Sequence, residues 1–268
     1  MTNRIAILGA GVMGETLLAA IVRGGHPVDA VVVAEKRDVR AKELHDIHGV
    51  EVTGSIEAVK GADVVLLVVK PQDMPSLLAE VGPHVASDAL VISLAAGIAL
   101  ATIEEALPIG VATVRAMPNT AALVGEGMFG VSPGTSCGEA TLAYAARLLG
   151  SGGKVAIVDE AQQDAVTGVS GSGPAYVFYL AEAMIAGGVE AGLDPETART
   201  LAVQTLVGSA KLLAESDDSP LELRTKVTSP NGTTAAAIST FDERGVNEAL
   251  VAGVLAAVRR SAELSGSE

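Results

Sequence analysis

The sequence predicts an α/β fold in which a mostly parallel β-sheet comes first and an all-helical region follows. Two observations support this prediction. Short apolar runs alternate with helical patterns as far as Glu160, which is the order expected of βαβ units. After Glu160 the strand signals vanish, and helical periodicity with capping residues takes over. We therefore expect one domain over residues 1–160 and a second, helical domain over residues 161–268.

The strands of the first domain are predicted from seven apolar runs. Strands covered on both faces of a parallel sheet read as continuous segments rich in Val, Ile and Leu. The runs are at residues 4–8, 31–34, 62–69, 90–93, 111–115, 127–132 and 154–158. Helical patterns fall between them, for example at residues 15–23 and 138–149. This alternation favours parallel neighbours joined by helical crossovers.

The second domain is predicted to hold five helices, at residues 174–191, 194–215, a short one from 219, 235–242 and 246–264. Ser172 or Gly173 is expected to cap the first of them. The pairs Asp194-Pro195 and Ser219-Pro220 open the second and third, because proline is favoured in the first helical turn.

Composition and charge exclude several classes of protein. A chain of 268 residues with 49% apolar residues can bury a large core. Its net charge of −14 argues against a nucleic-acid partner and against an anionic membrane surface. Cys137 is the single cysteine, so no intramolecular disulfide can form, and neither Cys nor His lies near it in sequence to suggest a metal site. With no visible targeting segment or membrane span, we expect a cytoplasmic protein.

A glycine-rich turn, Gly9-Ala10-Gly11-Val12-Met13-Gly14, follows the first apolar run and precedes a helical pattern. Strand, glycine turn and helix form the setting of a dinucleotide-binding fingerprint. Gly9 makes the turn, Gly11 lets a pyrophosphate approach the backbone, and Gly14 lets helix and strand pack closely. The pattern predicts a Rossmann-type first domain that binds a dinucleotide.

The charged residues after the second strand, Glu35-Lys36-Arg37, bear on the choice of dinucleotide. An acid there accepts from the ribose hydroxyls and favours NAD, whereas a base pairs with a 2′-phosphate and favours NADP. Both signs occur within three residues, and a solvated charge cluster is the third interpretation for two of them. The balance favours NADP(H), with NAD(H) as the alternative cofactor.

Two further strands end in segments suited to the rest of the cofactor. Lys70-Pro71-Gln72 closes the run at residues 62–69, and Ala95-Ala96-Gly97 follows the run at 90–93. Open α/β sheets bind ligands at the carboxyl ends of their strands. The small residues of the second segment let a flat nicotinamide or its ribose come close.

A polar loop in the helical domain, Val227-Thr228-Ser229-Pro230-Asn231-Gly232-Thr233-Thr234, precedes an Ala-rich helical run that begins at Ala235. Hydroxyls and backbone N–H groups at a helix N-terminus can bind a small anion. A capped turn is the alternative, because Ser, Thr, Asn and Gly are ordinary turn and cap residues. Since the first domain supplies a cofactor, we favour an anion site.

The helical domain is poor in strong bases. All four histidines belong to the first domain. The basic candidates of the second domain are Lys211, which is expected to be solvated, and Lys226, which adjoins the polar loop. An alcohol dehydrogenase needs a general base, whereas an imine can arrive already protonated. The composition therefore suits the reduction of a carboxylated imine held by neutral donors.

The helix expected at residues 174–191 is apolar nearly all round apart from Glu182 and Glu190. Such a helix must be buried, and about a hundred residues offer little core for it. A subunit interface solves this problem, and burial against the first domain is the alternative. We favour a dimer.

Taken together, these segments make the chain resemble the pyrroline-5-carboxylate reductase family from residue 4 to about residue 260. The resemblance rests on residues 9–14, 68–72, 93–97, 115–120, 164–176 and 227–234. It implies hydride transfer from NAD(P)H to 1-pyrroline-5-carboxylate, which gives L-proline in the last step of proline biosynthesis. It also implies a homodimer with interlocked helical domains, which in the family is often assembled further into a decamer of five dimers.

The resemblance also implies roles for individual residues. The turn at Leu8, Gly9, Ala10, Gly11, Val12 and Met13 would bind the pyrophosphate. Ser55 with Val68, Val69, Lys70 and Pro71 would line the path from adenosine to nicotinamide, and Ala95, Ala96 and Gly97 would contact the nicotinamide. Ser229, Gly232, Thr233 and Thr234 would bind the substrate carboxylate and ring nitrogen, with Glu160 and Thr167 nearby. Thr234 would donate to the ring nitrogen.

Two departures from the family pattern bear on these roles. Asn231 stands where the family often has the first of two glycines, and we expect the loop to survive because Asn tolerates left-handed backbone angles. Glu35-Lys36 replaces the family's usual Asn-Arg or Ser, which leaves the cofactor preference open.

Two rival functions are weaker. The β-hydroxyacid dehydrogenases share Gly171 and Gly173 but carry a catalytic Lys a few residues on, and residues 175–178 here hold none. A dinucleotide-sensing regulatory protein would not need an anion-binding loop.

Overall fold

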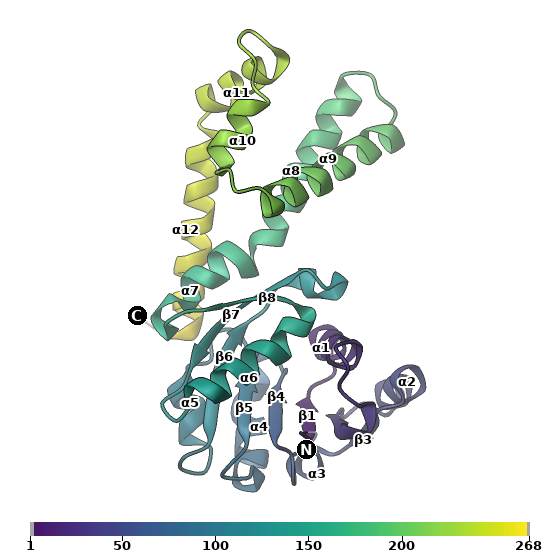
Figure 1. Ribbon diagram of the computed structural model, residues 1–268, viewed down its shortest axis with the longest axis vertical. Helices are drawn as coiled ribbons and strands as arrows, with labels where there is room; N and C mark the ends of the chain where they lie inside the picture. Colours follow the sequence, from purple (N-terminus) through teal and green to yellow (C-terminus); the bar gives the residue numbers. More distant parts are fainter. Residues whose placement is uncertain (1–2, 267–268) are drawn as a thin grey trace. The chain divides into compact units, whose positions relative to one another are not determined.

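The computed structural model describes residues 3–266, which divide by their contacts into two compact units. The first unit runs to Ser172 and also includes the residues from Ala257 on; the second is Gly173–Ala256. An α/β unit built on a mostly parallel sheet and a helical unit are present, so the predicted fold class is confirmed (Figure 1).

The sheet of the first unit has eight strands within residues 3–266, in the order β3-β2-β1-β4-β5-β6-β7-β8. Neighbouring strands are parallel except β6 and β7, which are antiparallel. The strands are β1 (Ile5–Leu8), β2 (Val31–Ala34), β3 (Glu51–Thr53), β4 (Val64–Leu67), β5 (Leu90–Ser93), β6 (Ala112–Met117), β7 (Gly127–Pro133) and β8 (Gly153–Ile157). The order reverses between β1 and β4, which is where such sheets bind ligands.

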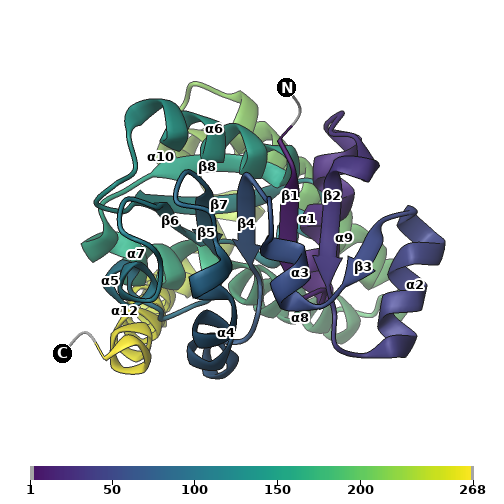
Figure 2. The same cartoon turned by 90° about the horizontal axis from the view of Figure 1, so that it is seen from below.

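Helices cover both faces of this sheet. They are α1 (Val12–Arg23), α2 (Asp38–His48), α3 (Ser55–Val59), α4 (Met74–Val81), α5 (Leu100–Glu105), α6 (Glu139–Leu149) and α7 (Gln163–Val166). One buried cluster packs α1 and α6 against the sheet, and another packs α3, α4 and α5 against its other face (Figure 2). Every residue of β1, β2, β4 and β5 is buried, so their continuous apolar sequences follow from covering on both faces.

Two features of this unit were not expected. β3 is an edge strand whose sequence, Glu51-Val52-Thr53, has no apolar run and whose side chains are half-buried or exposed. The second is a helical stretch before residue 174: α7 continues into a π-helix at Thr167–Gly171, which leads to the next helix. The expected capped start at Ser172 or Gly173 was therefore wrong.

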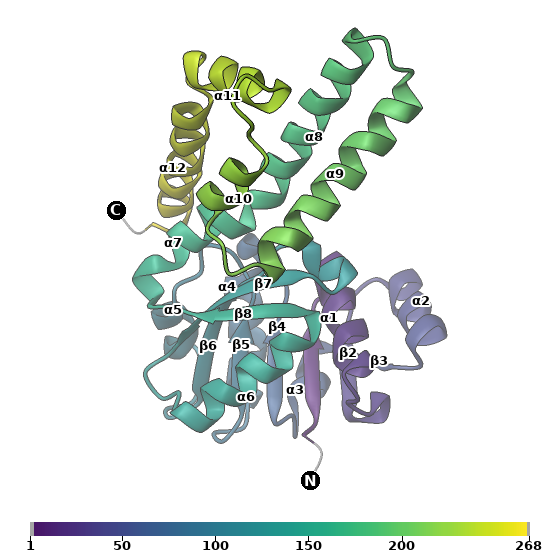
Figure 3. The ribbon, with the colours of Figure 1, turned by 45° about the horizontal axis from the view of Figure 1, so that its top comes forward.

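The helical unit contains α8 (Gly173–Glu190), α9 (Pro195–Glu215), α10 (Pro220–Lys226), α11 (Thr233–Glu243) and most of α12 (Val246–Ser265). α8 and α9 form an antiparallel hairpin (Figure 3). Asp194 caps α9 by accepting from the Thr197 N–H at 3.0 Å, and Ser219 with Glu222 forms a capping box on α10. These are the starts that the two proline pairs predicted.

The helical unit has almost no core of its own. Its only buried residues are Ala198 and Ala202, and no residue of α8 is buried. The aromatic side chains of Phe178 and Tyr179 are 62% and 72% exposed. A single copy of this unit therefore leaves a large apolar surface open to solvent.

Candidate active site

The glycine turn between β1 and α1 has the backbone shape that the fingerprint requires. Gly9 adopts φ +98°, and a Cβ at this position would lie 2.7 Å from the carbonyl oxygen of Val68. A Cβ on Gly14 would overlap the carbonyl oxygen of Gly9. A Cβ on Gly11 would meet nothing within 4 Å. Gly9 and Gly14 are thus needed for packing, whereas the space at Gly11 is open for a ligand.

Gly11 is also the N-cap of α1 and supplies no side-chain hydrogen bond to that helix. The first N–H groups of a helix have no partners within it, and the helix dipole places partial positive charge there. Open space at Gly11 in front of such a helix end fits a pyrophosphate. The residues present therefore fit the predicted dinucleotide.

Behind this turn, Arg40 and His48 of α2 brace the start of α1. The Nε of Arg40 donates to the carbonyl oxygen of Ala10 at 3.3 Å, and its other nitrogens pair with Glu15 and Glu43. His48 Nε2 lies 3.1 Å from Glu15 Oε1, and this hydrogen bond, together with Arg40, holds the pKa of Glu15 below its ordinary value. Sequence reasoning missed this network, because nothing in the spacing of these residues brings α2 to the glycine turn.

A cavity of about 340 Å³ lies beside the turn at the ends of β1, β2 and β4. It is lined by Leu8, Gly9, Ala34, Glu35, Lys36, Arg37, Ser55, Val69, Asp73, Ser76 and Leu77. Seven of these eleven were predicted as cofactor contacts, and Ala34, the last residue of β2, was predicted only as part of a strand. Asp73, Ser76 and Leu77 were missed, although their position just after the carboxyl end of β4 was a signal that could have found them.

At the end of β2, Arg37 is held by Glu35. The Arg37 backbone N–H and Nε donate to Glu35 Oε1, both at 2.9 Å, and Nη2 donates to Oε2 at 3.1 Å. The Glu35 side chain is 8% exposed and that of Arg37 67%. These hydrogen bonds from Arg37 lower the pKa of Glu35, so its carboxylate is ionised at neutral pH.

Lys36 occupies the same rim but has no close partner of this kind. Its side chain is 81% exposed, and its Nζ lies 3.7 Å from Glu80. Lys36 and Glu80 also line an adjoining hollow of about 460 Å³ with Asp38 and Ser55. Exposed pairs of this kind contribute little to stability, so the ammonium group is free to meet an anion.

The carboxyl ends of β4 and β5 place the other predicted cofactor residues. The N–H of Val68 donates to the carbonyl oxygen of Leu8 at 2.8 Å, which keeps this segment beside β1. Lys70 and Pro71 are exposed and begin a short 3-10 helix. After β5, Ala95 is buried, Ala96 is exposed, and Gly97 adopts φ +70°. The exposed turn thus offers small residues to a flat ring.

Glu160 and Thr167, predicted to lie near the substrate, both belong to the first unit and both have partners there. Glu160 Oε1 accepts from the N–H of Leu100 at 2.7 Å and from Nη1 of the buried Arg115 at 3.1 Å. The Thr167 hydroxyl donates to the carbonyl oxygen of Gln163 at 2.9 Å. Glu160 therefore neutralises a buried arginine whatever else it does.

The polar loop of the second unit is a tight turn that ends in a helix. The N–H of Gly232 donates to the carbonyl oxygen of Ser229 at 3.0 Å, across Pro230 and Asn231. Asn231 adopts φ +57° and is the only non-glycine with positive φ among residues 3–266. Proline followed by a left-handed residue is typical of a type II turn. The expectation that Asn231 preserves the loop is confirmed.

The turn delivers two threonines directly to the start of α11. That helix begins at Thr233, not at Ala235 as expected, so Thr233 and Thr234 occupy its first turn. Its N-cap, Gly232, has no side chain to bond the first N–H groups. Hydroxyls and unbonded amides are thus gathered at one helix end, which is a suitable arrangement for a carboxylate.

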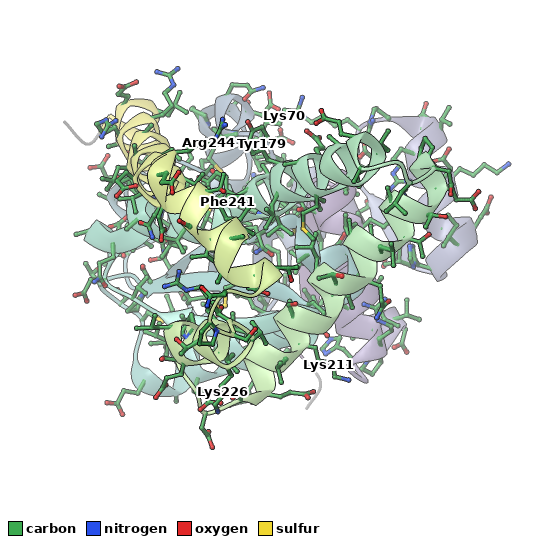
Figure 4. The ribbon with its side chains drawn as sticks, turned by 90° about the horizontal axis from the view of Figure 1, so that it is seen from above. Lys70, Tyr179, Lys211, Lys226, Phe241 and Arg244 are labelled. Atoms are coloured by element: carbon green, nitrogen blue, oxygen red, sulfur yellow. The ribbon has the colours of Figure 1, made fainter. Side chains whose placement is uncertain are left out.

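Neither lysine of the second unit is a free base. Lys226 Nζ lies 2.5 Å from Asp218 Oδ2, and Lys211 Nζ lies 3.8 Å from Glu215 Oε1 (Figure 4). The hydrogen bond from Lys226 lowers the pKa of Asp218. Because its amino group is engaged by the Asp218 carboxylate, Lys226 is a weaker general-base candidate than its place beside the polar loop indicated.

Other reactive groups lie outside these sites. Cys137 is half-buried, and burial raises the pKa of its thiol, which makes it a poor nucleophile. Among residues 3–266 no three His, Cys, Asp or Glu side chains are grouped as a metal site. No helix in the described part of the chain is long and apolar enough to span a membrane.

The parallel sheet, the glycine turn and the cavity at its switch point define a dinucleotide-binding protein of the Rossmann class. Two family models match the chain. The model described as "NADP oxidoreductase coenzyme F420-dependent" matches residues 4–97, and the model described as "Pyrroline-5-carboxylate reductase dimerisation" matches residues 160–264. The chain belongs to the pyrroline-5-carboxylate reductase family, because it is 40% identical to the pyrroline-5-carboxylate reductase of Mycobacterium tuberculosis over 97% of this chain and 96% of that protein.

Solved structures agree with this assignment. A pyrroline-5-carboxylate reductase from Coxiella burnetii superposes with a TM-score of 0.93 at 32% identity, over 99% of both chains. A pyrroline carboxylate reductase from Plasmodium falciparum with NADP bound superposes with a TM-score of 0.87 at 26% identity, over 98% of both chains. The predicted resemblance to this family is confirmed.

Proposed function

We propose that this chain reduces L-1-pyrroline-5-carboxylate to L-proline by hydride transfer from NAD(P)H, as the last step of proline biosynthesis. The observation that carries the proposal is its full-length match to proteins of this activity, at 40% identity over 97% of the chain. The lack of an unpaired lysine or any histidine in the helical unit agrees with it, because reduction of a protonated imine needs no general base.

The first unit holds the cofactor, for which NADP(H) is favoured and NAD(H) is the alternative. The backbone at Leu8, Gly9, Ala10, Gly11, Val12, Met13 and Gly14 binds the pyrophosphate at the N-terminus of α1. Glu35, Lys36, Arg37 and Ser55 surround the adenosine end. Val68, Val69, Lys70 and Pro71 line the path to the nicotinamide, which rests on Ala95, Ala96 and Gly97. When bound, the reduced cofactor supplies the hydride.

The polar loop and the start of α11 hold the substrate. Ser229, Gly232 and Thr233 offer hydroxyl and amide donors to its carboxylate. Thr234 donates a hydrogen bond to the ring nitrogen once hydride addition gives that nitrogen a lone pair, and Glu160 and Thr167 are close to the ring. The hydride adds to the imine carbon, the C=N π electrons neutralise the iminium nitrogen, and the proton already on that nitrogen remains there. The protein then has to orient the two reactants and exclude water.

Assembly completes the proposal. The functional division falls at residues 1–160, for the dinucleotide, and 161–268, for substrate and dimerisation. The exposed apolar surface of α8 and α9 is covered in a homodimer, and five dimers form a decamer. The net charge of −14 agrees with a small-molecule substrate and with the absence of nucleic-acid or membrane partners, and the single cysteine agrees with the cytoplasm.

The test mixes the protein with 1-pyrroline-5-carboxylate and either NADPH or NADH and follows the reduced-nicotinamide absorbance band. We expect decay that depends on the imine and formation of proline in equal amount. No decay with either cofactor would refute the function. Formation of reduced cofactor when the protein is mixed with 3-hydroxyisobutyrate and oxidised NAD(P) would instead favour a β-hydroxyacid dehydrogenase.

A further inference from the structure

The acid at the end of β2 is the feature that does not fit a simple interpretation of cofactor choice. An acid in this position ordinarily accepts from both ribose hydroxyls and favours NAD. Here each carboxylate oxygen of Glu35 already accepts from the Arg37 guanidinium, and one also accepts from the backbone N–H. Paired, charge-assisted hydrogen bonds of this kind are among the strongest in proteins. Three of the four acceptor positions of the carboxylate are thus taken, so Glu35 cannot accept from both ribose hydroxyls while it holds Arg37.

Arg37 keeps donors for another partner while it is held. A guanidinium has five N–H donors, and Glu35 occupies one on Nε and one on Nη2, which leaves three. The side chain is largely exposed and lines the same cavity as Gly9 and Ser55. The anchored arginine is therefore available, in a fixed orientation, to an anion that enters the cavity.

We propose that Glu35 is a positioning residue that holds Arg37 at the rim of the cavity, where Arg37 and Lys36 bind the 2′-phosphate of NADP(H), and that Glu35 does not bind the ribose hydroxyls. The proposal rests on the proposed nucleotide-dependent reduction and assigns the specificity of its adenosine end.

The charges around the cavity explain why an anchored cation is needed. Asp73 lines this cavity, and Asp38 and Glu80 line the adjoining hollow. These carboxylates repel a 2′-phosphate, and exposed cations on long side chains offset them only when they are held in place. Glu35 and Arg37 together carry no net charge, so the held guanidinium offers the phosphate oriented N–H donors rather than extra positive charge. Lys36 is exposed and adds the second cation.

The Glu35→Gln variant separates the two roles, because they predict opposite results. If Glu35 positions Arg37, the variant binds NADPH about tenfold more weakly and NADH unchanged. If Glu35 reads the ribose, the variant binds NADH about tenfold more weakly, and NADPH as well or better. The measurement is a fluorescence titration of each reduced nucleotide without any imine, so it does not depend on turnover.

A double-mutant cycle tests whether Glu35 acts through Arg37. Arg37→Gln should weaken NADPH binding by about ten- to hundredfold, and Lys36→Gln by less, since an exposed lysine is less well oriented. The variant carrying both Glu35→Gln and Arg37→Gln should bind NADPH no worse than Arg37→Gln alone. In steady-state assays the loss should appear in KM for NADPH and leave kcat unchanged.

Lys42→Gln on α2 is the matched control, because it removes one exposed positive charge and its side chain does not line the cavity. It should leave both affinities within about twofold, and all variants should keep the wild-type melting temperature. Additive losses in the cycle, or unchanged NADPH binding in Glu35→Gln, would overturn the proposal. If wild-type protein binds neither nucleotide, both the role of Glu35 and the proposed function are wrong. If it binds nucleotide but does not reduce the imine, only the proposed function is wrong.

Discussion

Ser261 donates a hydrogen bond of 2.6 Å to the carboxylate of Asp164, although 97 positions separate them in the sequence. Ser261 is nearly buried, on the last turns of α12, and Asp164 is in α7 of the same unit. The backbone of Leu264, three residues further on, lies beside Gly97. A Cβ built on Gly97 would be 3.5 Å from the carbonyl oxygen of Leu264. The end of the chain therefore supports the turn assigned to the nicotinamide.

Removing this bond should loosen the end of α12. We expect Ser261→Ala to lower the free energy of unfolding by about 1–2 kcal/mol, because the half-buried carboxylate of Asp164 loses a partner. Thermal melts and urea titrations measure the loss. Ser239→Ala, at an exposed serine of α11, is the control and should change stability by less than about 0.5 kcal/mol. Equal effects would mean that the Ser261 contact is not specific.

The glycine turn gives a second prediction, in which two glycines respond differently. Gly14→Ala should lower stability by about 1–3 kcal/mol, because its methyl group would overlap the carbonyl oxygen of Gly9. Gly11→Ala should lower the melting temperature less than Gly14→Ala, because it only weakens the N-cap of α1. It should weaken dinucleotide binding by at least about tenfold, because its methyl group occupies the open space assigned to the pyrophosphate. Melts and nucleotide titrations of both variants check this pattern, and normal nucleotide binding by Gly11→Ala would contradict the site.

The role of Thr234 predicts a loss of turnover without a loss of cofactor. Thr234→Val keeps the shape of the side chain and removes the hydroxyl. We expect kcat/KM for the imine to fall about tenfold or more, with NADPH affinity unchanged. Thr240→Val is the matched control on the same helix, where the hydroxyl donates to the carbonyl oxygen of Ala236. Full activity in Thr234→Val would remove the hydroxyl from the mechanism.

The Glu15 network predicts a pH dependence of stability. Its hydrogen bonds to His48 and Arg40 lower the pKa of Glu15 from its ordinary value of 4.5. The stabilisation is therefore present above about pH 4.5 and is lost as the pH falls through the lowered folded value. Glu15→Gln should be less stable than wild type at neutral pH, and the difference should shrink below about pH 4. Urea titrations across this range measure it. A stability difference between Glu15→Gln and wild type that stays the same across this range would contradict the prediction.

Residue patterns along the chain predicted the elements that bury continuous apolar runs. Such runs identified the buried strands, and glycine and proline marked most helix ends. Edge strand β3 was not predicted, because a half-exposed strand of three residues has no continuous apolar run. The π-helix escaped as well, since Ser172-Gly173-Pro174 looks like a helix start, whereas the preceding residues already form helical turns.

Pairings of charged side chains were beyond sequence reasoning. In the sequence Glu35, Lys36 and Arg37 are three independent charges. In the structure Glu35 and Arg37 form an ion pair, and Lys36 lies near Glu80 instead. Lys226 was predicted as a candidate base beside the polar loop, but in the structure it donates to the carboxylate of Asp218, eight residues earlier. Local patterns do not encode which rotamers bring such groups together. Asn231, in contrast, was predictable, because its backbone tolerance is intrinsic to the residue.

The near absence of buried residues in α8–α11 has a consequence for handling the protein. When a second copy covers that apolar surface, as proposed, folding and assembly become a single equilibrium whose position depends on subunit concentration. Dilution then lowers the stability of the folded dimer. Each tenfold dilution reduces the free energy of unfolding by about 1.4 kcal/mol, so a sample diluted a thousandfold melts at a lower temperature.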